Sequence, residues 1–496
     1  MNKMELHTKS LRPSPEKNSK GIETIFKTEA TSGNGTTYGA FQSKDPILLM
    51  EKGTDEKQLE DVHGTGSHHP TSYVETLMHL FKGNVGSGIF ALGDAFKNAG
   101  LLLAPPLTIF LGVICVHAQH ILLRCNDEVK RRVGDCLQTK PGFAGTVELC
   151  FATGPIPLRK YSVFMRKLVN VFLCVTQLGF CCVYFVFIST NMKQVLDVYG
   201  WEMSVQLHMA IVLVPIVLST WIRNLKYLVP ISSIANFLVL AGYMATMYIM
   251  SHNLPPISER RYVADWKNIP LFFGTVIYSF EGITLVLPLK NEMKKPTNFN
   301  KPLGVLNVGM VFVGMMFVAM GFLGYLRYGD EVRGSVTLNL ASNEASQGVK
   351  DNFIYTSLPQ CIKLAISLSI LLTYALQFYV PVAIIWPQIV QQYGPFQYPV
   401  TAEIIFRSSV CFLTFILAEA IPHLGLFISL VGAVSSTALA LLFPPIIEMV
   451  VCWQSPKLDK VTITKDIFIL LIGLLGFATG TYESITAIVN QFSIDK

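Results

Sequence analysis

The sequence predicts an all-α polytopic membrane protein with about 11 transmembrane helices, and three observations support this. Of its 496 residues, 51% are hydrophobic and 15% are charged, whereas about a quarter of the residues in a soluble chain are charged. The mean hydropathy is +0.45. The charged residues lie between long apolar runs of about 17–25 residues, the length that crosses ~30 Å of hydrocarbon.

The N-terminal residues 1–70 are polar and rich in Ser, Thr, Gly, Lys and Glu, a composition typical of disorder. They contain no apolar signal region, so we expect a disordered cytosolic tail rather than a cleaved signal peptide. Within them, Asp45-Pro46-Ile47-Leu48-Leu49 resembles an acidic dileucine sorting signal. The plasma membrane and the endolysosomal membrane both remain open as locations.

Residues 71–490 are predicted to form one transmembrane domain. Helices 1–5 fall within about 76–250, helices 6–10 within about 268–450, and helix 11 at about 466–488. The apolar runs lie near 76–98, 102–124, 168–190, 206–222, 229–250, 268–289, 304–326, 360–385, 403–421, 424–450 and 466–488.

The distribution of lysine and arginine predicts the orientation of these helices. If the N-terminus is cytosolic, the segments on that side hold 27 of these residues, and the opposite loops with the C-terminus hold 9. Because lysine and arginine accumulate on the cytosolic side of membrane proteins, we expect the N-terminus in the cytosol. An odd helix count then places the C-terminus outside or in a lumen.

The composition also excludes several classes of function. The net charge of +6 comes from basic residues spread over loops without an aromatic–basic stripe, so we expect no nucleic-acid partner. No nucleophile–base pair, phosphate loop or metal-binding set is present. We therefore expect no enzyme and no cofactor other than a proton as coupling ion.

The first predicted helix is interrupted by Lys82-Gly83-Asn84-Val85-Gly86-Ser87-Gly88. Each glycine disfavours a helix by about 1 kcal/mol relative to alanine. An unwound turn would free backbone N–H groups, and the N-terminus of the next half-helix would attract a carboxylate. Close packing of small residues is the alternative explanation. The polar neighbours favour a substrate site, with Gly83, Asn84, Gly86, Ser87 and Gly88 as candidate binding residues.

His79 lies about one turn before this interruption. The unperturbed pKa of histidine, about 6.5, suits a group that takes up and releases protons near neutral pH. A single histidine in a membrane helix is also commonly a packing residue, and that alternative stays open. We take His79 as the candidate proton-coupling residue.

The sixth predicted helix carries Ser279-Phe280-Glu281-Gly282 in its middle. An isolated carboxylate is unfavourable in hydrocarbon, so Glu281 is paired, protonated or in contact with water. Carbonyl groups freed beside Gly282 could accept hydrogen bonds from an ammonium group. A structural ion pair or a backbone hydrogen bond is an equally good explanation for Glu281.

Two interrupted helices at matching positions of two halves are typical of the substrate site of a secondary transporter. They would hold a zwitterion, with its carboxylate at the first helix and its amine at the sixth, covered by Phe280. Tyr184 in the third helix is a weaker candidate for the wall of this site. The same holds for Tyr374 and Gln377 in the eighth helix, and packing is the commoner role for all three.

Several motifs also carry a family resemblance, which extends from His69 to Asn490. They are Leu77-Met78-His79-Leu80-Phe81-Lys82-Gly83-Asn84-Val85-Gly86-Ser87-Gly88, Asp94-Ala95-Phe96-Lys97-Asn98-Ala99-Gly100, Thr176-Gln177-Leu178-Gly179-Phe180-Cys181-Cys182-Val183-Tyr184-Phe185-Val186-Phe187, Arg223-Asn224-Leu225-Lys226, Phe280-Glu281-Gly282 and Leu287-Pro288-Leu289. With them the chain resembles the proton-coupled amino acid transporters of the amino acid/auxin permease group, especially those of insects.

This resemblance implies a leucine-transporter-like fold, in which helices 1–5 and 6–10 form inverted repeats. It also implies symport of protons with small neutral amino acids such as alanine, glycine or proline, and the family's proton-coupling histidine maps onto His79. The chain departs from the family pattern at Lys290, where glutamate is common, and at Thr284, where glycine is common. Thr284 lies nearer the site, so we expect it to affect substrate size.

Two other functions remain open at this point. One is a proton-independent facilitator or exchanger with the same fold. The other is an amino acid sensor that signals to a cytosolic growth-signalling complex through its tail and loops.

Overall fold

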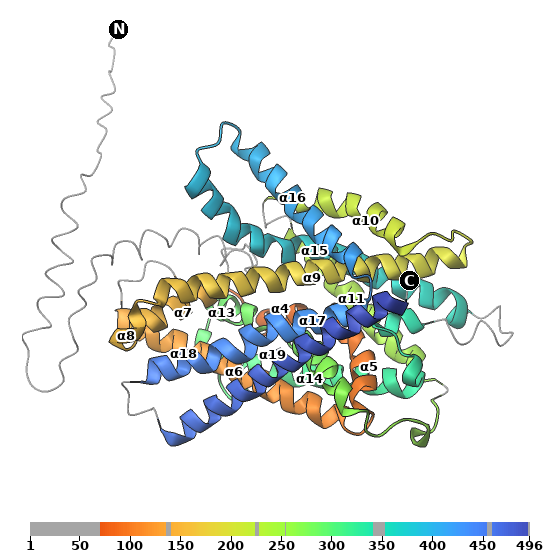
Figure 1. The fold of residues 1–496 in the computed structure, drawn as a ribbon, viewed down its shortest axis with the longest axis horizontal. Helices are drawn as coiled ribbons and strands as arrows, with labels where there is room; N and C mark the ends of the chain where they lie inside the picture. Colours follow the sequence, from red (N-terminus) through yellow and green to blue (C-terminus); the bar gives the residue numbers. More distant parts are fainter. Residues whose placement is uncertain are drawn as a thin grey trace, which may run out of the picture. The chain divides into compact units, whose positions relative to one another are not determined.

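A computed structural model describes residues 70–134, 140–223, 228–252, 254–340, 353–453 and 459–494. Within these ranges the regular elements are helices, together with one isolated β-bridge between Thr71 and Met293 (Figure 1). The predicted tail and its dileucine-like motif lie outside the described residues.

The first five spans are built from six long helices, and two further helices lie between the second and third spans. The spans are α4 (Tyr73–Asn84) with α5 (Ser87–Ala99), α6 (Ala104–Val133), α9 (Ser162–Val198), α10 (Val205–Thr220) and α11 (Leu228–Met250). The intervening helices are α7 (Phe143–Ala152) and α8 (Ile156–Arg159).

The remaining spans contain a second interrupted helix and a third that is partly π-helical. They are α12 (Ile269–Ser279) with α13 (Ile283–Glu292), α14 (Val305–Tyr328), α15 (Phe353–Tyr393), α16 (Pro399–Ala420), α17 (Leu424–Val431) continued by the π-helical η10 (Gly432–Ser436), η11 (Ala438–Leu442) and α18 (Phe443–Cys452), and finally α19 (Lys460–Ile494).

The number and order of these spans agree with the predicted polytopic fold. In the described chain, nine helical segments are long and apolar enough to cross a membrane. The interrupted pair α4–α5 and the 16-residue α10 occupy the two remaining predicted positions. The two interruptions fall in the first and sixth spans, where the sequence predicts them.

Counterparts from the two halves pack against each other. In the first and sixth spans, α4 contacts α13 and α5 contacts α12, so these interrupted helices run antiparallel. The second span contacts the seventh (α6 with α14), the third contacts the eighth (α9 with α15), and the fourth contacts the ninth (α10 with α16). This pairing is the one that a five-plus-five inverted repeat requires.

The segment 124–167, expected as a loop, is largely helical. It contains the last turns of α6, all of α7 and α8, and the start of α9. Hydropathy detects only the length that hydrocarbon imposes, whereas helices lengthen beyond the apolar run wherever neighbours cover them. Here α7 packs against α6, α9 and α18, and this contact explains its helical structure.

Two predicted spans also differ in form. The apolar run 360–385 is the middle of the longer α15, and the run 424–450 is not one α-helix. The second run contains two π-helical segments, in which backbone bonds join residues five apart. A periodicity argument cannot distinguish such a segment from an α-helix, because both present apolar side chains on all faces of a buried span.

A backbone connection joins the chain ahead of α4 to the chain after α13. The Thr71 N–H donates to the carbonyl of Glu292 at 2.9 Å, and the Lys294 N–H donates to the carbonyl of Thr71 at 3.0 Å. We call this connection, between Thr71 and residues 292–294, the strap. It ties together the free ends of the two half-helices that already contact each other.

Candidate functional site

The first interruption lies between α4 and α5, and local sequence explains it. The Asn84 side-chain amide donates to the carbonyl of Leu80 at 2.8 Å, which competes with continuation of the helix. Val85 has extended ψ, and Gly86 precedes the first turn of α5 without a side-chain cap. The first amides of α5 therefore have no partner within their own helix.

There is open space beside this interruption. A Cβ built on Gly86 would find no atom within 4 Å, so glycine is not required there by packing. Gly88 differs, because a Cβ there would lie 3.0 Å from the Cα and Oγ of Ser279. The open space thus adjoins the N-terminus of α5, where the helix dipole favours an anion.

The second interruption lies between α12 and α13. The N–H groups of Phe280 and Glu281 fold back onto the carbonyls of Val276 and Tyr278, at 3.0 and 3.3 Å, and end α12. Gly282 precedes α13, and a Cβ on it would lie 2.6 Å from the Oδ1 of Asn84. Glycine is required here by the close approach of the other interrupted helix.

Hydrogen bonds between side chains and backbone join the two interruptions. The Ser279 hydroxyl donates to the carbonyl of Gly88 at 3.1 Å and to that of Thr275 at 2.8 Å. The hydroxyls of Ser87 and Tyr278 lie 3.0 Å apart. The residues that the sequence predicts at the two sites are therefore brought together, on facing turns.

Several buried polar atoms at this place have no hydrogen-bond partner among the described residues. They are both carboxylate oxygens of Glu281, the Oδ1 of Asn84 and the hydroxyl of Ser436 in η10. Glu281 is only 6% exposed. Buried polar groups are normally satisfied, so a cluster of unsatisfied ones indicates a place where a proton, water or ligand binds.

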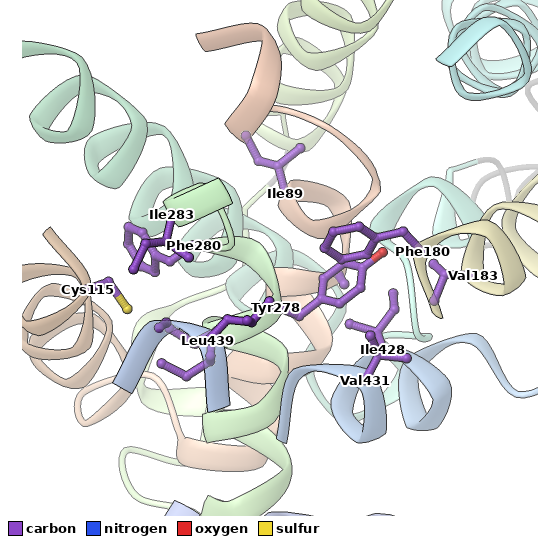
Figure 2. Close-up of a cluster of buried hydrophobic side chains, with 14 of the residues drawn as sticks. Ile89, Cys115, Phe180, Val183, Tyr278, Phe280, Ile283, Ile428, Val431 and Leu439 are labelled. Atoms are coloured by element: carbon purple, nitrogen blue, oxygen red, sulfur yellow. The ribbon is translucent and has the colours of Figure 1, made fainter. Parts of the chain in front are cut away.

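Apolar side chains surround these polar atoms. The rings of Phe180 and Tyr278 meet edge to face with centroids 4.7 Å apart, and those of Phe280 and Phe317 do so at 4.9 Å. Figure 2 shows Phe180 and Tyr278 beside Val431, with Phe280 on the opposite side of the α12 end, near Cys115. Such walls exclude water from the polar atoms that they surround.

Tyr184, on α9, lies at the edge of the aromatic side chains that surround the two interruptions. It is buried and interacts with Gln377 of α15 and with Tyr278. Tyr374 lies elsewhere: its hydroxyl is 2.8 Å from that of Thr414 on α16, and its ring stacks on Phe378. These contacts are those of a packing residue.

His79 lies in the middle of α4, ahead of the first interruption. The charged groups that act on the half-buried His79 ring are Lys82 and Glu75, on its own helix. The three residues share one face of α4.

Lys290, the departure from the family pattern, lies at the far end of α13 and not in this site. Its ammonium group is 2.6 Å from both carboxylate oxygens of Asp127 on α6. Thr284 is half-buried in the first turn of α13.

Sequence reasoning missed Tyr278, Phe180 and Ser436. One signal was present for Ser436, because Ser435-Ser436-Thr437 interrupts an otherwise apolar run. Phe180 and Tyr278 look like ordinary apolar positions, and only tertiary packing brings them to the interruptions.

A family model described as "Transmembrane amino acid transporter protein" matches residues 69–486. The chain belongs to this transporter family. It is thus a multi-pass integral membrane protein, and the resemblance seen in its motifs is confirmed.

Two members of the transporter family illustrate the similarity. "Proton-coupled amino acid transporter-like protein pathetic" of Drosophila melanogaster is 35% identical over 428 residues, which cover 86% of this chain and 87% of the relative. "Probable amino acid transporter skat-1" of Caenorhabditis elegans is 26% identical over 454 residues, which cover 86% of this chain and 91% of the relative.

Two solved structures are also similar to this protein. "Inward facing conformation of Mhp1" has a TM-score of 0.45 and 12% identity, covering 85% of this chain and 92% of that one. "Crystal structure of MhsT in complex with L-phenylalanine" has a TM-score of 0.46 and 12% identity, covering 86% of this chain and 99% of that one.

Proposed function

We propose that this protein is a symporter that moves a small neutral amino acid together with a proton. Membership of an amino acid transporter family gives the class of substrate. The single observation that supports a zwitterion site is the pair of facing helix interruptions, joined by the Ser279–Gly88 hydrogen bond. The name of the Drosophila relative favours coupling to protons.

The substrate carboxylate would bind at the first amides of α5, at Ser87 and Gly88, beside the open space at Gly86. The ammonium group would bind the carbonyls left free where α12 ends, near Ser279 and Phe280. Each charge then meets the helix end of opposite sign.

The bulky aromatic side chains around the two interruptions favour a small substrate. Phe280 fills the space against Gly112, where a Cβ would lie 2.8 Å from its ring, and Phe180 with Tyr278 closes the other side. Alanine, glycine and proline are therefore the first substrates to test, with Tyr184 as a more distant wall residue.

His79 remains the proposed proton-coupling residue. Its position on the half-exposed α4 suits a group that exchanges protons with water rather than one that contacts substrate. In the proposed orientation α4 begins at the cytosolic side, so His79 would pass the proton towards the cytosol. The membrane is the plasma membrane or an endolysosomal one.

Current in voltage-clamped cells that express the protein at their surface tests this function. A proton carried with a neutral substrate moves one charge, and each 100 mV contributes ~2.3 kcal/mol per charge. Addition of alanine, proline or glycine should give inward current that is larger at about pH 5.5 than at about pH 7.5.

Other outcomes would support the alternatives. Uptake without current would contradict symport and indicate a facilitator or exchanger. Surface expression with neither current nor uptake would favour another substrate or the sensor. Deletion of residues 1–70 then distinguishes the roles, because a sensor that uses its tail would lose growth signalling while any transport persists.

A further inference from the structure

The tenth span is π-helical where it passes the second interruption. Only Thr437 separates the segments η10 and η11, and its hydroxyl donates to the carbonyl of Gly432, five residues earlier, at 2.8 Å. π-Helical turns are rare and occur frequently at functional sites, because they are less stable than the α-helix that they replace. We therefore expect the tenth span to contribute to function where it passes the second interruption.

The π-helical segment and α12 touch backbone to backbone. A Cβ on Gly432 would collide with the carbonyl of Gly274 and would lie 2.9 Å from the Cβ of Tyr278. The Ser429 hydroxyl, just ahead of η10, donates to the carbonyl of Leu271 at 3.1 Å. A change at the end of α12 is thus transmitted directly to the tenth span.

The side chains of Glu281 and Ser436 meet where the π-helical segment packs against α12. Ser436, at the end of η10, interacts with the Glu281 carboxyl group, and neither side chain has a hydrogen bond to another described residue. The one titratable group that faces Glu281 from a neighbouring helix in the described chain is Cys115 of α6, a neutral thiol. No described cation faces Glu281 to balance a negative charge.

We propose that Glu281 is a proton-binding site where the sixth span faces the tenth, and that its neutral, protonated form keeps the two spans packed together at Ser436. An isolated carboxylate is strongly unfavourable in a dry apolar surrounding, whereas the neutral acid is compatible with it. Loss of the proton leaves a buried charge that no described cation balances, so water must enter between the two spans.

The consequence for transport is a coupling between proton and substrate. If this packed, protonated form holds the end of α12 in the conformation that binds substrate, then substrate binding favours protonation to the same degree. Both would bind and leave together, as symport requires. This inference rests on the proposed symport, and it places the proton at Glu281 before His79 passes it on.

Proteoliposomes containing the purified full chain provide the test. Glu281→Gln mimics the neutral acid. We expect this variant to keep alanine exchange between the two sides but to lose accumulation driven by a proton gradient. The ratio of its uptake at acidic and neutral pH should fall to about one, because the linked proton is absent.

Ser436→Ala removes the hydroxyl and leaves the carboxyl group. It should keep proton-driven accumulation but shift its midpoint to higher pH, by up to about one unit, since a hydroxyl that can donate to the carboxylate is lost. Glu419→Gln on α16, which packs against α9, α10 and α15, is the matched control and should change neither property.

An infrared difference spectrum between acidic and neutral pH gives a readout that is independent of transport. One component of the carbonyl-stretch band of protonated carboxylic acids should be present in the unaltered protein and in Glu419→Gln, and missing in Glu281→Gln. If Glu281→Gln does not fold, the Ser436→Ala midpoint decides, and an unchanged midpoint overturns the inference.

The remaining outcomes separate this inference from the function on which it rests. Proton-driven accumulation by Glu281→Gln with an unaltered pH dependence overturns the role of Glu281 and leaves symport intact. Unaltered protein that never accumulates alanine in a proton gradient overturns the proposed symport and this inference together.

Discussion

The two halves of the first span differ sharply in packing. In α5, ten of 13 residues are buried, and the helix contacts α6, α9, α12, α14 and α17. In α4, three of 12 are buried, and its main neighbours are α13 and α14. A region with few buried contacts is the one that moves at low free-energy cost. We therefore expect α4 to be the half that moves and α5 to be the half that stays with the scaffold.

The largest expected effect comes from breaking the packing of the α5 half. Gly88→Val places atoms against the backbone of Ser279 and pushes α5 away from α12. We expect a loss of stability of about 1–3 kcal/mol and of alanine uptake by more than about tenfold. Thermal unfolding and uptake in proteoliposomes measure the two effects.

Gly86→Ala is the matched control, since its Cβ has open space. It should keep the unfolding temperature of the unaltered protein and reduce uptake only for the larger substrates. Equal destabilisation by both variants would show that the two positions are packed alike and would remove the basis of the comparison.

The next largest effect concerns only the coupling of transport to protons. His79→Ala removes a side chain without a described hydrogen bond, so stability should change by less than about 0.5 kcal/mol. Uptake driven by a proton gradient should be lost while alanine exchange remains. His252→Ala, at an exposed loop position, is the control. Full uptake with unchanged pH dependence in His79→Ala would end its proposed role.

The sequence predicts features that depend on neighbouring residues, but not those that depend on contacts between distant parts of the chain. The interruptions were predictable, because glycine, asparagine and glutamate are locally incompatible with a helix in hydrocarbon. The link from Glu281 to Ser436 was not, since it joins residues far apart in the chain through packing of the sixth and tenth spans.

A smaller effect is expected where α13 is anchored. Lys290 is 10% exposed and its partner Asp127 is 49% exposed, so Asp127→Ala leaves a mostly buried ammonium group unpaired. We expect a loss of about 1 kcal/mol, limited by the solvent around Asp127. The double variant Lys290→Met/Asp127→Ala should be more stable than Asp127→Ala alone.

Thermal unfolding of the detergent-solubilised variants measures this difference. Strict additivity of the two substitutions would contradict a direct interaction between Lys290 and Asp127.

The smallest effect concerns the start of α4. Ser72 and Glu75 form a capping box, with the Ser72 N–H 2.7 Å from the Glu75 carboxylate. The Ser72 N–H, and then its hydroxyl, hold the pKa of Glu75 below its ordinary value of 4.5. A lowered pKa stabilises α4 above that value, and this contribution is lost as the pH falls through the lowered pKa.

Ser72→Ala should weaken the start of α4 by about 1 kcal/mol. Hydrogen exchange of the α4 amides should then be faster at neutral pH, with no change in α5. Faster exchange throughout both helices would mean that the two halves of the span unfold together.

The strap has a mechanical consequence. Because Thr71 is hydrogen-bonded to the chain on both sides of Met293, a pull on the chain ahead of it acts on α4 and α13 at once. One half-helix of the first span and one of the sixth are thus held by the same connection, which directly follows residues 1–69 in the chain. A bulky or tethered partner bound to the N-terminal segment would therefore resist movement of α4 and α13 during the transport cycle.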